Sequence, residues 1–150
     1  MKRLSYLIIF LLIVVVIGVT LIPTDRNRIK GVVGGCKTAI VNRDISGFME
    51  NISFNYGDDY GNSYLLLKKR LAKLLDHFSD FEITADVMGM EIDEETAEVD
   101  LKLSVIATEG DSRKYLIGDA GWPQDMKVYF EKSPSLQWKI MRAERFKQNH

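Results

Sequence analysis

The sequence predicts an α+β protein in which helical patterns come first and strands follow. Between residues 25 and 78, apolar side chains recur every three or four positions, which is the period of an α-helix. From residue 81 onward the period falls to two, which is typical of strands with one buried face. Helices followed by such strands indicate a helical layer packed across one face of a mostly antiparallel sheet.

Composition limits the functional classes. The chain has 150 residues and a formal net charge of −1, so no basic excess points to a nucleic-acid partner. Cys36 is the single cysteine, which excludes an intrachain disulfide and a CxxC-type metal or redox site. The sequence predicts no cofactor and no metal.

An uncharged apolar run of 19 residues covers Leu4–Ile22. As a helix it would measure roughly 28 Å, close to the thickness of the hydrocarbon layer of a bilayer. A secretory signal peptide is the competing interpretation, but its apolar region is usually about 7 to 15 residues long and ends at a small-residue cleavage site. We therefore expect a transmembrane anchor at 1–23 that is not cleaved, and a folded domain at 24–150. A very short tail before the span favours a domain outside the cytoplasm, in the periplasm, although positive charge flanks both ends of the span.

Two helices are expected in the domain. The first covers about 25–53, and Gly31, Gly34 and Gly35 would each destabilise it by on the order of 1 kcal/mol, so a bend or break is expected there. The second begins after a cap at 62 or 63, where Asn62 and Ser63 are both good N-cap residues. Its apolar face comprises Tyr64, Leu67, Leu71, Leu74, Leu75 and Phe78.

About four extended runs are expected after residue 80. The first two, about 81–92 and 97–105, form an antiparallel hairpin, and Gly89 predicts a bulge because the apolar set changes there to Met88, Met90 and Ile92. A third region follows residue 111 and is interrupted at 118–123, and the last run covers 136–145. A sheet with such a bulge curves and leaves a hollow beneath the helices.

The turn at 54–64, between the two helical patterns, contains the candidate site. Its glycines allow a tight reversal, and its aspartates can hydrogen-bond to turn backbone groups. Tyrosines and carboxylates in one short turn also supply apolar surface together with polar groups, which is typical of the edge of a pocket. We expect Tyr56, Tyr60 and Tyr64 to contact a ligand.

Four short phrases occur in this order of elements: Ala39-Ile40-Val41-Asn42-Arg43-Asp44 leading to Phe48-Met49, Tyr56-Gly57-Asp58-Asp59-Tyr60-Gly61, Thr96-Ala97-Glu98-Val99 and Trp138-Lys139-Ile140. With the order of the elements, they resemble the nuclear transport factor 2-like superfamily, the cone fold that ketosteroid isomerases and scytalone dehydratases share. The resemblance covers about 25–145. The chain is particularly similar to membrane-anchored or exported bacterial members with no assigned activity. The resemblance implies a cone that holds a small apolar ligand and a homodimer formed through the outer face of the sheet.

The catalytic residues of those enzymes do not carry over. A ketosteroid isomerase needs a carboxylate and an oxyanion donor pair that face each other across the cone. Here Asp86 falls in the outward set of its strand. Scytalone dehydratases rely on inward histidines, and this chain has only His77 and His150. We expect His77 to cap the end of the second helix.

Two functions follow from these patterns. The first is a membrane-tethered, noncatalytic module that binds a ligand or takes part in protein assembly. The alternative is an enzyme of isomerase or dehydratase type on a small hydrophobic substrate, with Tyr56 or Tyr60 as the proton donor and Asp58 or Asp59 as the base. A carboxylate that faces the cone with a raised pKa would favour the enzyme, whereas aspartates that cap the turn would favour the module. A Ca²⁺ site at the turn is disfavoured because it has too few ligands.

Overall fold

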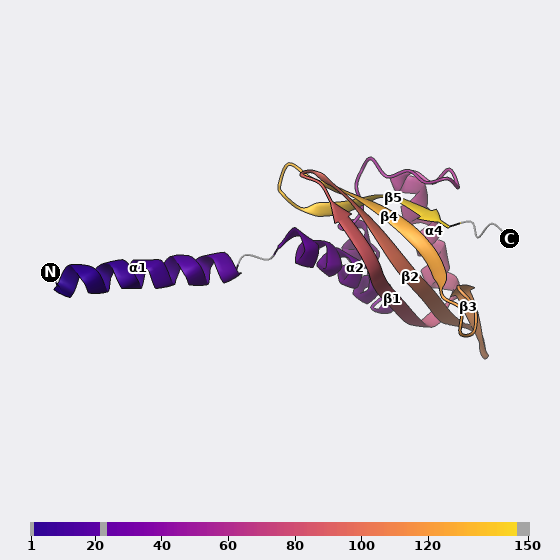
Figure 1. The fold of residues 1–150 in the computed structure, drawn as a ribbon. Helices are drawn as coiled ribbons and strands as arrows, with labels where there is room; N and C mark the ends of the chain where they lie inside the picture. Colours follow the sequence, from indigo (N-terminus) through magenta and orange to yellow (C-terminus); the bar gives the residue numbers. More distant parts are fainter. Residues whose placement is uncertain (1, 22–23, 147–150) are drawn as a thin grey trace.

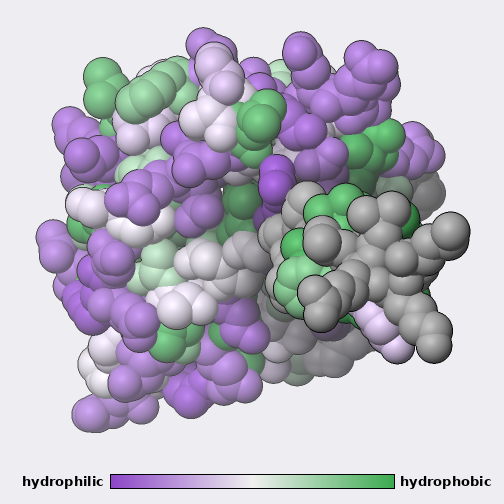
Figure 2. Space-filling model, turned by 90° about the vertical axis from the view of Figure 1, so that its left-hand side faces the viewer, coloured by the Kyte–Doolittle hydropathy of each residue, from purple (hydrophilic) through white to green (hydrophobic). Residues whose placement is uncertain are grey.

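The computed structural model describes residues 2–21 and 24–146, and within the first helix the side chains of residues 6 and 8–17. The first helix, α1 (Lys2–Leu21), extends away from the rest of the chain (Figure 1). Its described side chains are exposed, for example Phe10 at 67%. Viewed from the α1 end, hydrophilic residues prevail on the domain, whereas the described part of α1 is hydrophobic (Figure 2). Among the described residues no helix is both long and apolar enough to cross a membrane.

The predicted anchor at 1–23 therefore stays a prediction. Residues 1, 22 and 23, which belong to it, lie outside the described residues, as does His150.

The domain contains one sheet whose strand pairings are all antiparallel. Along the sheet the order is β1-β2-β4-β5, and β3 pairs with the second half of β2. The sheet thus has five strands, one more than predicted, because the expected third region turns at Gly118 (φ +78°) and divides into two strands. The strands are β1 (Ser79–Ile92), β2 (Thr96–Glu109), β3 (Ser112–Ile117), β4 (Gln124–Lys132) and β5 (Trp138–Arg145).

The predicted bulge at Gly89 is confirmed. The pairing of β1 with β2 shifts register between Val87 and Gly89, and a Cβ at Gly89 would lie 3.3 Å from the carboxylate of Asp100. Val87 and Met90 both pack against the core, whereas Met88 is 61% exposed. The expectation that Met88 joins the inward set is therefore wrong. Met88 follows Val87 on the outward side and has no partner on β2, and this extra residue places Met90 opposite the core residue Val99.

Three further helices, α2, α3 and α4, form the second layer. The prediction of one helix over 25–53 is wrong, since the chain forms two helices there with a break at residues 42–44. The predicted second helix is confirmed, with Ser63 as its N-cap and Leu71 and Leu75 buried. The bounds are α2 (Asp25–Val41), α3 (Ile45–Met49) and α4 (Tyr64–His77).

The break at 42–44 has a cause that is distant in sequence. Arg43 adopts a left-handed conformation with φ +60°, and its guanidinium donates hydrogen bonds to the carbonyl oxygens of Leu75 and Phe78 at the end of α4. The next residue, Asp44, restarts the helix because its side chain accepts a hydrogen bond from the Gly47 amide at 2.9 Å. These contacts decide the position of the break, and α2 continues through its glycines.

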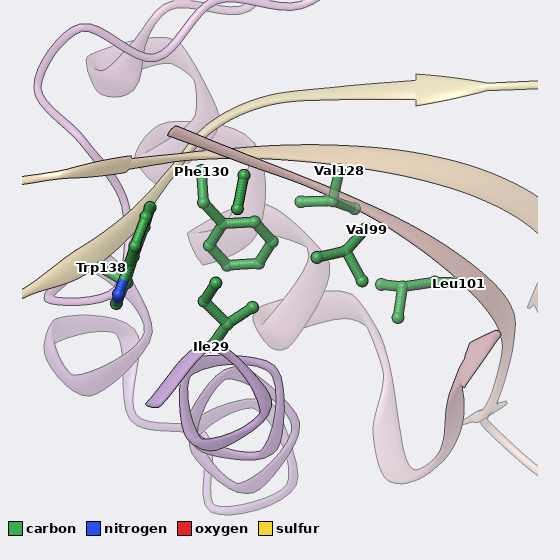
Figure 3. Packing of buried hydrophobic residues seen from close by; sticks show 7 residues of the cluster. Ile29, Val99, Leu101, Val128, Phe130 and Trp138 are labelled. Carbon is green, nitrogen blue, oxygen red and sulfur yellow. The ribbon is translucent and has the colours of Figure 1, made fainter. Parts of the chain in front are cut away.

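The beginning of α2 is held against the sheet at one end of the domain. Ile29 is fully buried between the sheet residues Val99, Phe130 and Trp138 (Figure 3). Beside it, Asp25 accepts a hydrogen bond from the indole Nε1 of Trp138 at 3.0 Å and pairs with Lys132 at 3.1 Å. These contacts join the first turn of α2 to β4 and β5.

The Asp25 contacts predict a pH-dependent contribution to stability. The hydrogen bonds from Trp138 and Lys132 hold the pKa of Asp25 below its usual value. Because the side chain is 35% exposed and therefore screened, we expect Asp25→Asn to lower the free energy of unfolding by only about 1 kcal/mol at pH 7. A depressed carboxyl pKa stabilises the folded state above the unfolded-state pKa, and this contribution is lost as pH falls through the lower folded-state value.

Urea unfolding at pH 7 and at pH 3 measures this effect. The difference between wild type and Asp25→Asn should shrink at pH 3. Asp111→Asn, in an exposed turn, serves as the matched control and should change little at either pH. A difference between wild type and Asp25→Asn that is equal at both pH values would contradict the assignment.

Candidate functional site

A partly enclosed cavity of about 300 Å³ lies between the helices and the concave face of the sheet. Every helix and strand of the domain contributes to its wall, and nearly all of the wall is hydrocarbon. Cavities of this size and composition are typical sites for small ligands. The lining residues are Val33, Cys36, Lys37, Ile40, Phe48, Ile52, Tyr56, Leu67, Ile83, Ala85, Leu101, Leu103, Val105, Ile117, Met126, Val128, Ile140 and Ala143.

Helical and strand periodicity together produce this wall. In α2 the lining residues Cys36 and Lys37 follow Val33 by three and four positions. Ile40 follows the same pair by four and three positions, so all of them share one helix face. On β1 and β2 the lining residues alternate with exposed polar ones, as Ala85 does with Asp86. Asp86 therefore points outward, as its place in the alternation predicts.

The turn at 54–64 lies at the edge of this cavity, and only one of its tyrosines lines it. Tyr56 is 8% exposed and belongs to the wall. Tyr60 is 56% exposed, with the guanidinium of Arg145 5.6 Å from its ring centre. Tyr64 begins α4, and its ring lies 4.8 Å from that of Phe54. The turn is therefore brought to the cavity mainly through Tyr56.

Asp58 holds the turn together. Its carboxylate accepts hydrogen bonds from the Tyr56 hydroxyl at 3.0 Å, from the Tyr60 amide at 2.9 Å and from both the backbone and the side chain of Asn62 at 2.9 and 2.8 Å. Desolvation raises the pKa of Asp58. The hydrogen bonds that its carboxylate accepts, led by those from Asn62, lower the pKa by more, so the net pKa lies below its usual value. Desolvation and the neighbouring Asp58 charge raise the pKa of Tyr56.

The second aspartate of the turn is a surface residue. Asp59 pairs with Arg142 of β5 at 2.8 Å, and its side chain is 61% exposed. Neither Asp58 nor Asp59 belongs to the cavity wall. His77, expected as a helix cap, instead contacts the Glu109 carboxylate on β2. Among residues 2–21 and 24–146, no cluster of side chains could hold a metal ion.

Two wall residues were not predicted as site residues. Cys36 was expected to be a small core residue, yet it lines the cavity, and desolvation raises the pKa of its thiol to about 12. Among the described residues of the wall, Lys37 alone has a side chain that is charged at neutral pH. The helical spacing of Val33, Cys36 and Ile40 could have placed both residues, because Lys37 follows Val33 by four positions.

Three more open hollows lie elsewhere on the described part of the domain. One, of about 500 Å³, borders the connection between β3 and β4, where Trp122 is 79% exposed. Another, of about 610 Å³, lies beside the first turns of α2. Both have mixed polar and apolar walls. The third, of about 420 Å³ between Met88 and Phe146, is a more open surface hollow, so the partly enclosed cavity under the helices is the hollow best suited to an apolar ligand.

No protein-family model matches the chain, and no curated protein matches it in sequence. Solved structures do match. One is a nuclear transport factor 2-like protein with a cystatin-like fold from Novosphingobium aromaticivorans, 11% identical with a TM-score of 0.63 over 83% of this chain and 82% of that one. Another, from Nostoc punctiforme, is a protein of unknown function with a cystatin-like fold, 12% identical with a TM-score of 0.63 over 81% of this chain and 91% of that one.

Bd1075 of Bdellovibrio bacteriovorus is 15% identical with a TM-score of 0.60, but the match covers 81% of this chain and only 40% of that protein. Likenesses of this kind establish the fold, which is nuclear transport factor 2-like, with helices packed on an antiparallel sheet. They confirm the predicted α+β class and the cone.

The raised pKa of Cys36 predicts slow alkylation. Because the thiolate is the reacting form, iodoacetamide at pH 8 should modify the native chain at least about tenfold more slowly than the chain unfolded in urea. The native rate should keep rising through pH 10, whereas the unfolded rate levels off near the ordinary thiol pKa. Since Cys36 is the only cysteine, mass spectrometry reports this site alone. Equal rates in the two states would contradict the half-buried, desolvated position of the thiol.

Proposed function

We propose that this nuclear transport factor 2-like chain is a noncatalytic module, tethered to a membrane, that binds a small apolar ligand in the cavity beneath its helices. The observation that supports the binding role most strongly is the cavity itself. About 300 Å³ of space is walled by hydrocarbon from every element of the domain. Each methylene group that a ligand transfers there from water would contribute about 0.8 kcal/mol to binding.

The tether is supported by the sequence and by the exposure of α1. The run from Leu4 to Ile22 contains no charged residue. The large apolar side chains that the structure describes in α1 are between 50% (Ile13) and 71% (Tyr6) exposed. An exposed apolar helix is stabilised when lipid covers it. With Lys2 and Arg3 on the cytoplasmic side of the span, the domain would lie in the periplasm.

Dimerisation through the outer face of the sheet remains part of this proposal. That face carries ion pairs, such as those of Lys127 with Glu98 at 3.3 Å and with Asp100 at 3.8 Å. A face of this polarity suits a weak interface more than an obligate one. Protein assembly is the second role that such a face could serve.

An isomerase or dehydratase activity is the alternative function, and Tyr56 is the observation in its favour because its ring lines the cavity. The pKa shifts in the turn disfavour an acid-base reaction. The lowered pKa of Asp58 makes its carboxylate a weak base, and the raised pKa of Tyr56 makes its hydroxyl a poor acid. The Tyr56 hydroxyl donates a hydrogen bond to the Asp58 carboxylate, and Asp58 also accepts a hydrogen bond from the backbone of the turn.

Binding of 1-decanol to the full chain tests the proposal. The chain is kept in lipid nanodiscs because α1 is apolar, and bound ligand is measured by equilibrium dialysis against a known free concentration. We expect saturable binding of one decanol per chain. Ala85→Phe places a ring in the cavity and should weaken this binding at least about tenfold, provided that circular dichroism shows an intact fold.

Ala120→Phe, in an exposed turn away from the cavity wall, is the matched control and should bind as wild type does. An absence of saturable binding, or equal binding by Ala85→Phe and wild type, would overturn the cavity as the site. Native mass spectrometry of the same preparation reports the number of subunits and any small molecule that copurifies.

A further inference from the structure

The charge at the cavity is set by one residue, Lys37. Its side chain is exposed, and it lies on the face of α2 that lines the cavity, between Val33 and Ile40. It makes no ion pair with any residue that the structure describes. No carboxylate belongs to the described wall, so nothing in the wall neutralises this cation.

The other polar groups of the wall offer little to a ligand. The Tyr56 hydroxyl already donates its proton to Asp58. The Cys36 thiol is a weak hydrogen-bond donor. A ligand that fills the cavity therefore meets hydrocarbon on nearly every side, and at the edge of the described wall the exposed, flexible side chain of Lys37 carries a strong donor.

We propose that the cavity binds an anionic amphiphile, with its hydrocarbon body inside and its anionic head paired with Lys37. This inference rests on the proposed binding function and specifies the class of ligand. A neutral hydrocarbon would leave the ammonium without a partner at the cavity, and a cationic head would be repelled by it. An exposed lysine at the edge keeps the head partly hydrated while the apolar body leaves water, so neither charge is fully desolvated.

Three ligands with the same ten-carbon chain test the head group, namely decanoate, 1-decanol and decylammonium. We expect wild type to bind decanoate about fivefold more tightly than decanol, which corresponds to a partly screened ion pair, and to bind decylammonium least tightly. Octanoate should bind about 16-fold more weakly than decanoate as long as both chains fit, since each methylene changes the dissociation constant about fourfold.

Lys37→Met keeps the apolar stem and removes the charge. It should abolish the preference for decanoate over decanol, measured within this variant as the ratio of the two dissociation constants. Lys69→Met, on the exposed face of α4, removes the same charge away from the cavity wall and should leave the preference intact. Binding is measured on the full chain in nanodiscs, with Ala85→Phe as the blank that subtracts partition into lipid.

The outcomes separate this inference from the proposed function. If decanol binds as tightly as decanoate, or if Lys37→Met preserves the preference, the inference of an anionic head group is wrong. The proposal that the apolar cavity binds a ligand is unaffected by that result. If Lys37→Met and Lys69→Met reduce the preference equally, the effect is one of overall charge and the assignment to Lys37 is overturned. If none of the three ligands gives saturable binding above the Ala85→Phe blank, the proposed function itself fails.

Discussion

The contact of Ile29 with the sheet is the constraint on which the rest of the domain depends. Ile29 fixes the beginning of α2 against β2, β4 and β5, and the Asp25 bond to Trp138 fixes the same turn from the side. A second cluster, centred on Leu71 and Leu75 of α4, packs on β1 and β2. Since interiors are otherwise close-packed, space remains where the sheet curves away between these contacts. The cavity is the result of two layers joined at separate points.

The same arrangement separates the polar chemistry of the chain from its cavity. The turn that contains Asp58 and Asp59 contacts the hollow mainly through the ring of Tyr56. Asp58 is engaged by the turn itself, and Asp59 faces Arg142 on the surface. Among the residues that the structure describes, the apolar interior is thus left with Lys37 at its edge as a cation without an ion pair. An acid-base reaction needs titratable groups that converge on one point, whereas binding needs the shape and hydrocarbon wall that this fold provides.

Features set by local chemistry could be predicted from the sequence. The start of α4 at Ser63 follows from a hydroxyl that caps the next turn, and the bulge at Gly89 follows from the change of alternation. The break at Arg43 could not be predicted, because it depends on carbonyl groups of Leu75 and Phe78 more than thirty positions away. The glycines nearer the start of α2 gave the stronger local signal, and tertiary contacts overrode it.

The candidate site was predictable only in part for a similar reason. The composition of the turn indicates a place where a chain reverses, but not which way each tyrosine points. Tyr60 and Tyr64 were expected beside Tyr56 at a ligand, and the structure places neither in the cavity wall. Lys37 carries no motif, and it becomes visible only when the face of α2 is set against the sheet. The periodicity of the sequence shows which residues share one face of a helix or strand. A site requires the helix face and the sheet face to be placed against each other.

Xenon binding, followed by the methyl NMR signals of the full chain, tests the central claim most directly, because xenon enters dry apolar cavities without needing a polar partner. The account predicts xenon-dependent shifts confined to methyl groups of the cavity wall, such as Ile83, Leu101 and Ile140. The tightly packed methyl groups of Ile29 and Val99 should not move. Shifts centred on Ile29 and Val99, or none at any wall residue, would contradict a domain that is packed at its ends and hollow between them.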